Sequence, residues 1–88
     1  ERKQALSLSE SLQLGRNLIK ERGWRNTGKV LLKMKNHLKK YPLIRMDYLE
    51  IRDSEDLRKV KRIKRRVLLA GAVWAGKTRL IDNILVKP

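Results

Sequence analysis

The sequence contains no cysteine and no phenylalanine, a single histidine, and no long apolar run. Without cysteine the chain forms no disulfide and no thiolate-bound zinc or iron–sulfur site, and His37 alone supplies one imidazole. No segment approaches the roughly 20 consecutive apolar residues that cross a bilayer, and the charged start is unlike a secretory signal. We therefore expect a cytoplasmic chain with neither a metal site nor a membrane partner.

Positive charge dominates the composition of the chain. The 88 residues include 23 Lys and Arg against 9 Asp and Glu, a formal net charge of +14. Such a chain attracts phosphates and nucleic acid, although a solvated basic surface is the simpler interpretation. The densest run, residues 58–66, has seven basic residues in nine, interrupted by Val60 and Ile63. That interruption favours a folded connector within one small domain, residues 1–88.

Helical periodicity covers the first half of the chain. Apolar residues three or four apart predict a helix over residues 1–22, and Gly23 follows it as a helix-ending glycine. A second helix is predicted from a cap at Asn26 or Thr27 to a point before Pro42. The two apolar stripes contain Ala5, Leu8, Leu12 and Ile19, then Val30, Leu31, Met34 and Leu38.

The second half has the pattern of strands. Alternation predicts a strand over residues 44–52, followed by a turn or cap at residues 53–57. Residues 67–74 are apolar or small at every position, which is typical of a central strand covered on both faces. Gly76 predicts a tight turn into a last strand, residues 78–86. The predicted fold is α+β, with two antiparallel helices packed on one face of a small, mainly antiparallel three-stranded sheet.

One motif needs its structural context. Residues 71–78 match the phosphate-binding pattern G-x-x-x-x-G-K-[ST] in every letter. That chemistry needs a helix opening at the Gly-Lys-Thr and a parallel sheet, yet only ten residues follow Thr78. We therefore predict a β-hairpin whose residues match the motif by chance.

Polar residues on the predicted strands have simple structural interpretations. We assign Asp47, Glu50 and Asp82 to ion pairs with the abundant Arg and Lys, or to water-facing positions. Asp82 is also a candidate to orient Arg79 or to cap the hairpin. Tyr48, Trp74 and the aliphatic stripes are interpreted as core or core-edge residues.

Three segments in this order, residues 5–12, 45–53 and 79–83 (the last reading R-L-I-D-N), resemble the C-terminal third of pantothenate synthetases. These are AMP-forming pantoate–β-alanine ligases. The resemblance implies that residues 1–88 are the C-terminal lid domain of a two-domain enzyme. The larger N-terminal catalytic domain, of the nucleotidyltransferase superfamily, would bind ATP, Mg²⁺ and pantoate, and it is absent here.

In that family ATP activates pantoate as an acyl adenylate, and the amine of β-alanine then displaces AMP. The resemblance carries no catalytic residue to this segment, so we expect the isolated segment to be inactive and to bind neither ATP nor Mg²⁺. We expect lid contacts from Lys77, Thr78 and Arg79, because cations on a turn can reach bound phosphates without being buried. The expected partners are the N-terminal domain, pantoate and β-alanine, with homodimerisation through the absent domain and no nucleic acid.

The run at residues 58–66 is more basic than the corresponding connector of the family. The alternative hypothesis is therefore a small basic nucleic-acid-binding module that uses this run and the lysines of the second helix.

Overall fold

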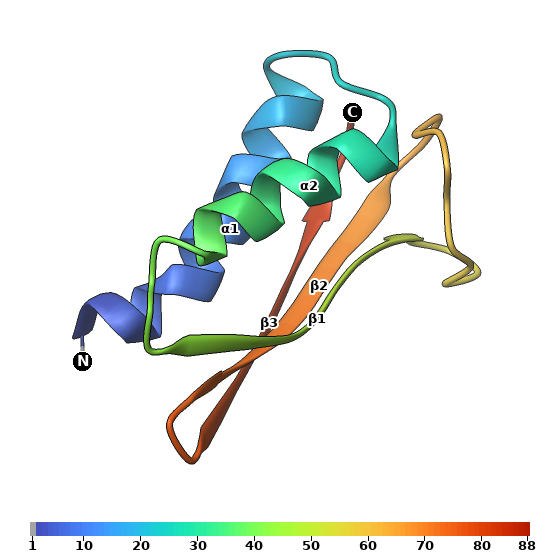
Figure 1. Ribbon diagram of the computed structural model, residues 1–88. Helices are drawn as coiled ribbons and strands as arrows, with labels where there is room; N and C mark the ends of the chain where they lie inside the picture. The colour runs from blue at the N-terminus through green and yellow to red at the C-terminus, as the bar shows by residue number, and fades with distance from the viewer. Residues whose placement is uncertain (1) are drawn as a thin grey trace.

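The computed structural model describes residues 2–88, with side chains from residue 4 onward. Two helices precede three strands along the chain (Figure 1). Their bounds are α1 Arg2–Lys20, α2 Thr27–Leu38, β1 Ile44–Asp53, β2 Val67–Ala75 and β3 Thr78–Val86. The first helix was predicted to start at Glu1, which lies outside the described residues, and it ends two positions before Arg22.

Local signals determine where the helices end and begin. Gly23 has φ of 71°, a conformation that glycine adopts without steric cost, and the next residue, Trp24, donates its backbone N–H to the carbonyl of Leu18 at 2.9 Å. Asn26 is the N-cap of α2, and its side chain accepts the N–H of Lys29 at 3.0 Å. The predicted turn between the helices is confirmed, and Asn26 rather than Thr27 provides the cap.

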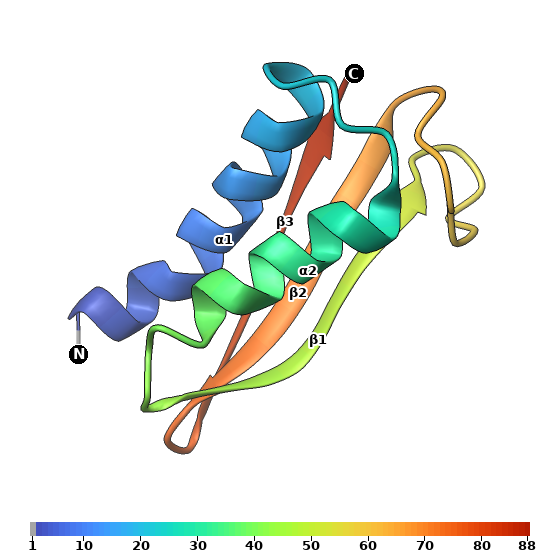
Figure 2. The same ribbon diagram turned by 45° about the horizontal axis from the view of Figure 1, so that its top comes forward.

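The strands form one antiparallel sheet in the order β1-β2-β3. Both helices lie on the same face of this sheet: α1 packs on β2 and β3, and α2 packs on β1 (Figures 1 and 2). The predicted fold class is confirmed. The core lies between the two layers, and the residues that fill it are buried Leu8, Leu12, Leu18, Ile19, Val30, Met34, Leu38, Leu49, Ile51, Ile63, Val67, Leu69, Val73 and Val86.

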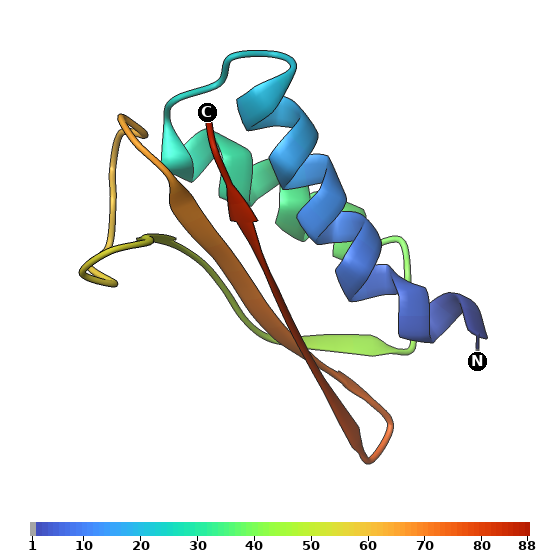
Figure 3. The same cartoon turned by 180° about the vertical axis from the view of Figure 1, so that it is seen from behind.

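Within the described residues 2–88, no helix covers the other face of the sheet, as the view from behind shows (Figure 3). The expectation that β2 is covered on both faces is therefore wrong. Leu68 and Trp74 on this open face are only partly buried, whereas Ala72 is buried because its cross-strand neighbours are the larger Tyr48 and Ile81. The small residues of β2 therefore have the same sequence pattern as a strand covered on both faces, although no second layer covers the open face here.

The elongated domain has two distinct ends. The start of α1, the α2–β1 connection and the β2–β3 turn gather at one end (Figure 1). The α1–α2 connection, the C-terminus and the β1–β2 loop gather at the other (Figure 2). Within residues 2–88, no helix has the length and apolar character needed to cross a membrane.

Candidate functional site

The G-x-x-x-x-G-K-T motif lies along β2 and the turn that follows it. β2 ends at Ala75, β3 begins at Thr78, and these two residues pair directly. Gly76 and Lys77 form the two-residue turn, and Gly76 has φ of 63°, the positive value that a type II′ turn requires at its first central position. Because a strand, not a helix, follows the motif, its N–H groups enter a sheet ladder. The predicted hairpin is confirmed, and the geometry of a phosphate-binding loop does not form.

The three predicted lid residues do not converge on one point. Thr78 lines a hollow of about 500 Å³ at this end of the domain. Arg79 lies over the ring of Tyr48 at 6.0 Å and pairs with Asp47, with Nη2 2.9 Å and Nε 3.0 Å from the carboxylate. Lys77 is exposed at the turn and has no carboxylate partner among the side chains from residue 4 onward. Strand alternation explains why Thr78 and Arg79 face opposite sides of the sheet.

The hollow beside Thr78 is mainly apolar. It is lined by the start of α1, the α2–β1 connection and the hairpin turn, namely Gln4, Ala5, Leu43, Ala75, Gly76, Thr78 and Leu80. The Oε1 atom of Gln4 is buried and accepts no hydrogen bond within the described part of the chain. Leu43 is 72% exposed. A buried acceptor beside an exposed leucine gives this end of the domain a surface that a partner can complete.

On the open face, acidic side chains pair as predicted. Glu50 accepts hydrogen bonds from Arg52 at 3.0 Å and 3.2 Å, and these hold the pKa of Glu50 below its usual value. Arg79 pairs with Asp47 rather than with Asp82, which corrects the suggestion that Asp82 orients it. Asp47 is the extra residue at a register shift between Met46 and Tyr48, and such a bulge redirects a side chain away from its direct neighbour.

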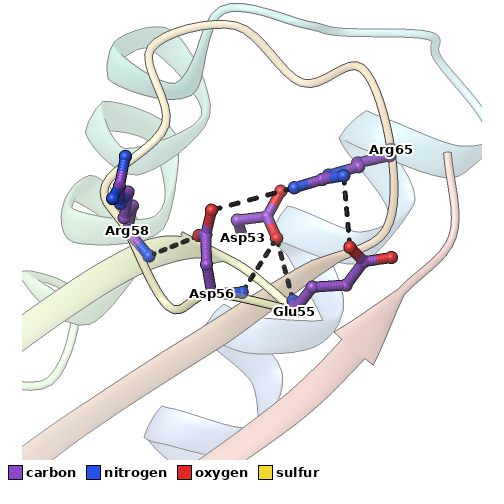
Figure 4. Close-up of polar contacts among 5 residues, drawn as sticks. All are labelled: Asp53, Glu55, Asp56, Arg58 and Arg65. Atoms are coloured by element: carbon purple, nitrogen blue, oxygen red, sulfur yellow. Dashed lines mark hydrogen bonds and ion pairs between the residues drawn. The ribbon is translucent and has the colours of Figure 1, made fainter.

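A second polar cluster closes the turn after β1 (Figure 4). The carboxylate of Asp53 accepts the backbone N–H groups of Glu55 at 2.8 Å and Asp56 at 3.3 Å, as the predicted turn requires. Arg65 donates to the same carboxylate at 2.6 Å and approaches Glu55 at 3.2 Å and Asp56 at 3.8 Å. The hydrogen bond from Arg65, followed by that from the Glu55 N–H, lowers the pKa of Asp53.

The single histidine lies on α2 beside Glu10 of α1. His37 Nε2 lies 3.8 Å from a carboxylate oxygen of Glu10, which also accepts the hydroxyl of Tyr41. This hydrogen bond raises the pKa of Tyr41. Among residues 2–88 no group of three or more His, Asp or Glu side chains is arranged to hold a metal ion.

Comparison with known proteins gives the family of this chain. The sequence profile described as pantoate-beta-alanine ligase matches residues 1–85. The chain belongs to the pantoate–β-alanine ligase family. It is 45% identical over 86 residues to a pantothenate synthetase from Thermotoga neapolitana, and 46% identical over 87 residues to one from Clostridium novyi. A crystal structure of pantothenate synthetase from Thermus thermophilus superimposes with a TM-score of 0.88 at 29% identity, over 99% of this chain.

The chain spans only part of these pantoate–β-alanine ligase relatives. The match to the Thermotoga neapolitana protein includes 98% of this chain but only 30% of that protein's length. The superposition on the Thermus thermophilus structure includes 31% of that chain. The resemblance read from the R-L-I-D-N segment and its neighbours is thereby confirmed at the level of the family. The relatives are ligases of pantothenate synthesis, and what this segment contributes to such an activity is a separate question.

Proposed function

We propose that this chain is the lid domain of a pantoate–β-alanine ligase, which closes over the reactive intermediate held by a separate catalytic domain. The observation that carries the proposal is the extent of the family match, which includes residues 1–85 yet corresponds to only 30% of a relative's length. A compact helix-on-sheet unit of this size fits the role of a movable cover.

The proposed reaction has two steps. The pantoate carboxylate attacks the α-phosphorus of ATP, which forms pantoyl adenylate and releases pyrophosphate. The amine of β-alanine then attacks the acyl carbon, and AMP leaves as pantothenate forms. Water competes with the amine for the same carbon, so a cover that excludes water while admitting β-alanine raises the yield of pantothenate per ATP.

The end of the domain with the hairpin turn is the proposed contact surface. Lys77 is exposed there without a carboxylate partner among the side chains from residue 4 onward, and Thr78 lines a largely apolar hollow. The charge of Arg79 is partly neutralised by Asp47. We therefore assign Arg79 to this ion pair on the open face of the sheet rather than to phosphate binding. In this arrangement Lys77 approaches the phosphates of bound ATP as a point charge.

This segment does not itself hold the cofactors in the proposal. The hairpin at Gly76 forms no nest of N–H groups for phosphates, and the carboxylates of Asp53, Glu55 and Asp56 are paired with Arg65. ATP and Mg²⁺ are therefore assigned to the catalytic domain. We further propose that the full enzyme is cytoplasmic and dimerises through that domain.

A chimeric enzyme tests the proposal. The 86 residues of the Thermotoga neapolitana protein that align with this chain are replaced by this chain, and pantothenate formation is measured. We expect an active enzyme in which Lys77→Ala raises the KM for ATP by roughly 10- to 150-fold, since a charge-assisted contact contributes about 1.5–3 kcal/mol. Lys33→Ala, which removes an exposed lysine from α2, is the matched control. An inactive but folded chimera contradicts the lid assignment, and an unchanged KM in Lys77→Ala removes Lys77 from the contact surface.

A further inference from the structure

The β1–β2 loop, residues 54–66, lies at the end of the domain opposite the hairpin turn (Figure 1). It contains seven Lys and Arg against two acidic residues. The three carboxylates of the turn after β1, those of Asp53, Glu55 and Asp56, all converge on one guanidinium, that of Arg65 (Figure 4). Six other basic side chains of the loop are exposed, and none has a carboxylate partner among the side chains from residue 4 onward: Arg58, Lys59, Lys61, Arg62, Lys64 and Arg66.

These cations are held in place by the fold. The buried side chain of Ile63 is 2% exposed and its N–H donates to the carbonyl of Arg25 at 2.8 Å. Thr27, at the start of α2, donates its hydroxyl to the carbonyl of Val60 at 2.6 Å and its N–H to that of Lys61 at 3.1 Å. The loop is thus fixed to the body at its middle, so its charges are preorganised rather than spread over a mobile tail.

Three hollows follow one another along this loop. The largest, about 630 Å³, is lined by six basic residues of the loop, among them Arg62 and Lys64, and by two acids, Asp53 and Asp56, that pair with Arg65. Arg62 also lines a neighbouring hollow with Lys29 at the start of α2, and Lys64 lines a third with Lys87. Arg62 and Lys64 each line two of the hollows, so the three hollows adjoin one another and their basic side chains form a track from Lys29 to Lys87.

We propose that this track, which we call the basic track, binds the phosphate backbone of single-stranded nucleic acid. A succession of cation-lined hollows suits a flexible chain of phosphates better than a flat bilayer. Trp24 is the one aromatic side chain among the residues lining these three hollows, so base stacking is limited and binding is independent of sequence. This inference does not rest on the ligase proposal, because the hairpin end stays free. The sequence led us to expect no nucleic-acid partner, and that expectation was made before the pairing of the three acids with Arg65 was known.

The test measures binding of the 88-residue chain to a fluorescent oligouridine of about 16 nucleotides, within the range of single-strand site sizes. If four to six phosphates are contacted, the slope of log K against log salt is about −3 to −4. Substitution of Lys59, Lys61 and Lys64 by Gln removes about three contacts and should reduce the slope by about 2. The control replaces Lys39, Lys40 and Arg45 by Gln, which removes the same charge from exposed positions between the end of α2 and the start of β1, away from the basic track.

The outcomes separate the possibilities. A weakened slope in the loop variant alone, with both variants showing the far-ultraviolet circular dichroism of the parent, supports the basic track. Equal losses in the two variants mean that net charge alone governs binding, and the inference is wrong. Tighter binding to phosphatidylserine vesicles than to the oligonucleotide at the same salt would assign the surface to a membrane instead.

Discussion

Substitution of Gly71 by alanine should disturb the contact between the helix layer and the sheet. Gly71 is a buried residue at the centre of β2, and α1 approaches it closely. A Cβ atom built at this position lies 2.6 Å from Leu49 Cδ2, 2.9 Å from Leu8 Cδ1 and 3.2 Å from the carbonyl oxygen of Tyr48. The two leucines are buried core residues, with Leu49 7% and Leu8 2% exposed, and the carbonyl belongs to the paired strand β1.

The size of the effect follows from two opposing terms. Overpacking a filled core destabilises by about 1–3 kcal/mol, whereas replacing glycine reduces the entropy of the unfolded chain and offsets about 0.4–1 kcal/mol of this. The expected net loss for Gly71→Ala is about 1–2 kcal/mol, or a melting temperature lower by roughly 4–16 °C for a domain of this size.

A matched variant controls for the loss of glycine itself. At Gly15 in α1 an added Cβ lies 2.6 Å from the sulfur of Met34, a flexible side chain, and 3.0 Å from Leu69 Cδ1. Alanine also favours a helix interior by about 1 kcal/mol over glycine. Gly15→Ala should therefore lose less stability than Gly71→Ala in urea unfolding followed by circular dichroism. Equal stability of Gly71→Ala and the parent would refute the close helix–sheet packing at this residue.

Three further predictions concern the loop and the open face. Ile63→Ala should destabilise the domain by about 2–4 kcal/mol in urea unfolding, because Ile63 is the loop's buried anchor; a change below about 1 kcal/mol would mean that the loop is not anchored by burial. The pKa of Asp53 is lowered in the folded state, so its contribution to stability is present above the unfolded value of about 4 and is lost as pH falls through the folded value. The free energy of unfolding should thus depend less on pH below about 4 in Asp53→Asn than in the parent, and identical acid limbs would contradict this. A double-mutant cycle of Asp47→Ala and Arg79→Ala should give a coupling below about 1 kcal/mol, since both side chains are more than a third exposed, and a coupling above about 2 kcal/mol would contradict this account.

The layers of the fold were predictable because each depends on local signals. Helical spacing locates Leu8, Leu12, Val30 and Met34 on one side of their helices, and Gly76 marks the hairpin. The hairpin also decided against the nucleotide-binding motif, since the same letters need a helix after Lys77. These signals operate within a few residues of the chain, so they are visible in the sequence.

The pairing of charged side chains was not predictable. Asp47 reaches Arg79 only because a bulge in β1 changes the register, and no residue pattern in the sequence predicts that bulge. Many ion pairs are possible between the seven bases of the β1–β2 loop and three acids, namely the loop's own two and Asp53 at the end of β1. Only the folded path of the chain brings all three acids to Arg65. The sequence did not predict the open face of the sheet for a related reason. Alanines at positions 70 and 72 are compatible either with a second layer packed on the strand or with larger neighbours on the adjacent strands.

The most direct test of the lid assignment is the ratio of pyrophosphate released to pantothenate formed by the chimeric enzyme. A domain that shields the adenylate from water keeps this ratio close to one when β-alanine is saturating. The same enzyme truncated before the segment should release excess pyrophosphate for each pantothenate, because water then reaches the acyl carbon. A truncated enzyme that folds, turns over and keeps the ratio at one would contradict the proposal that this domain is a cover.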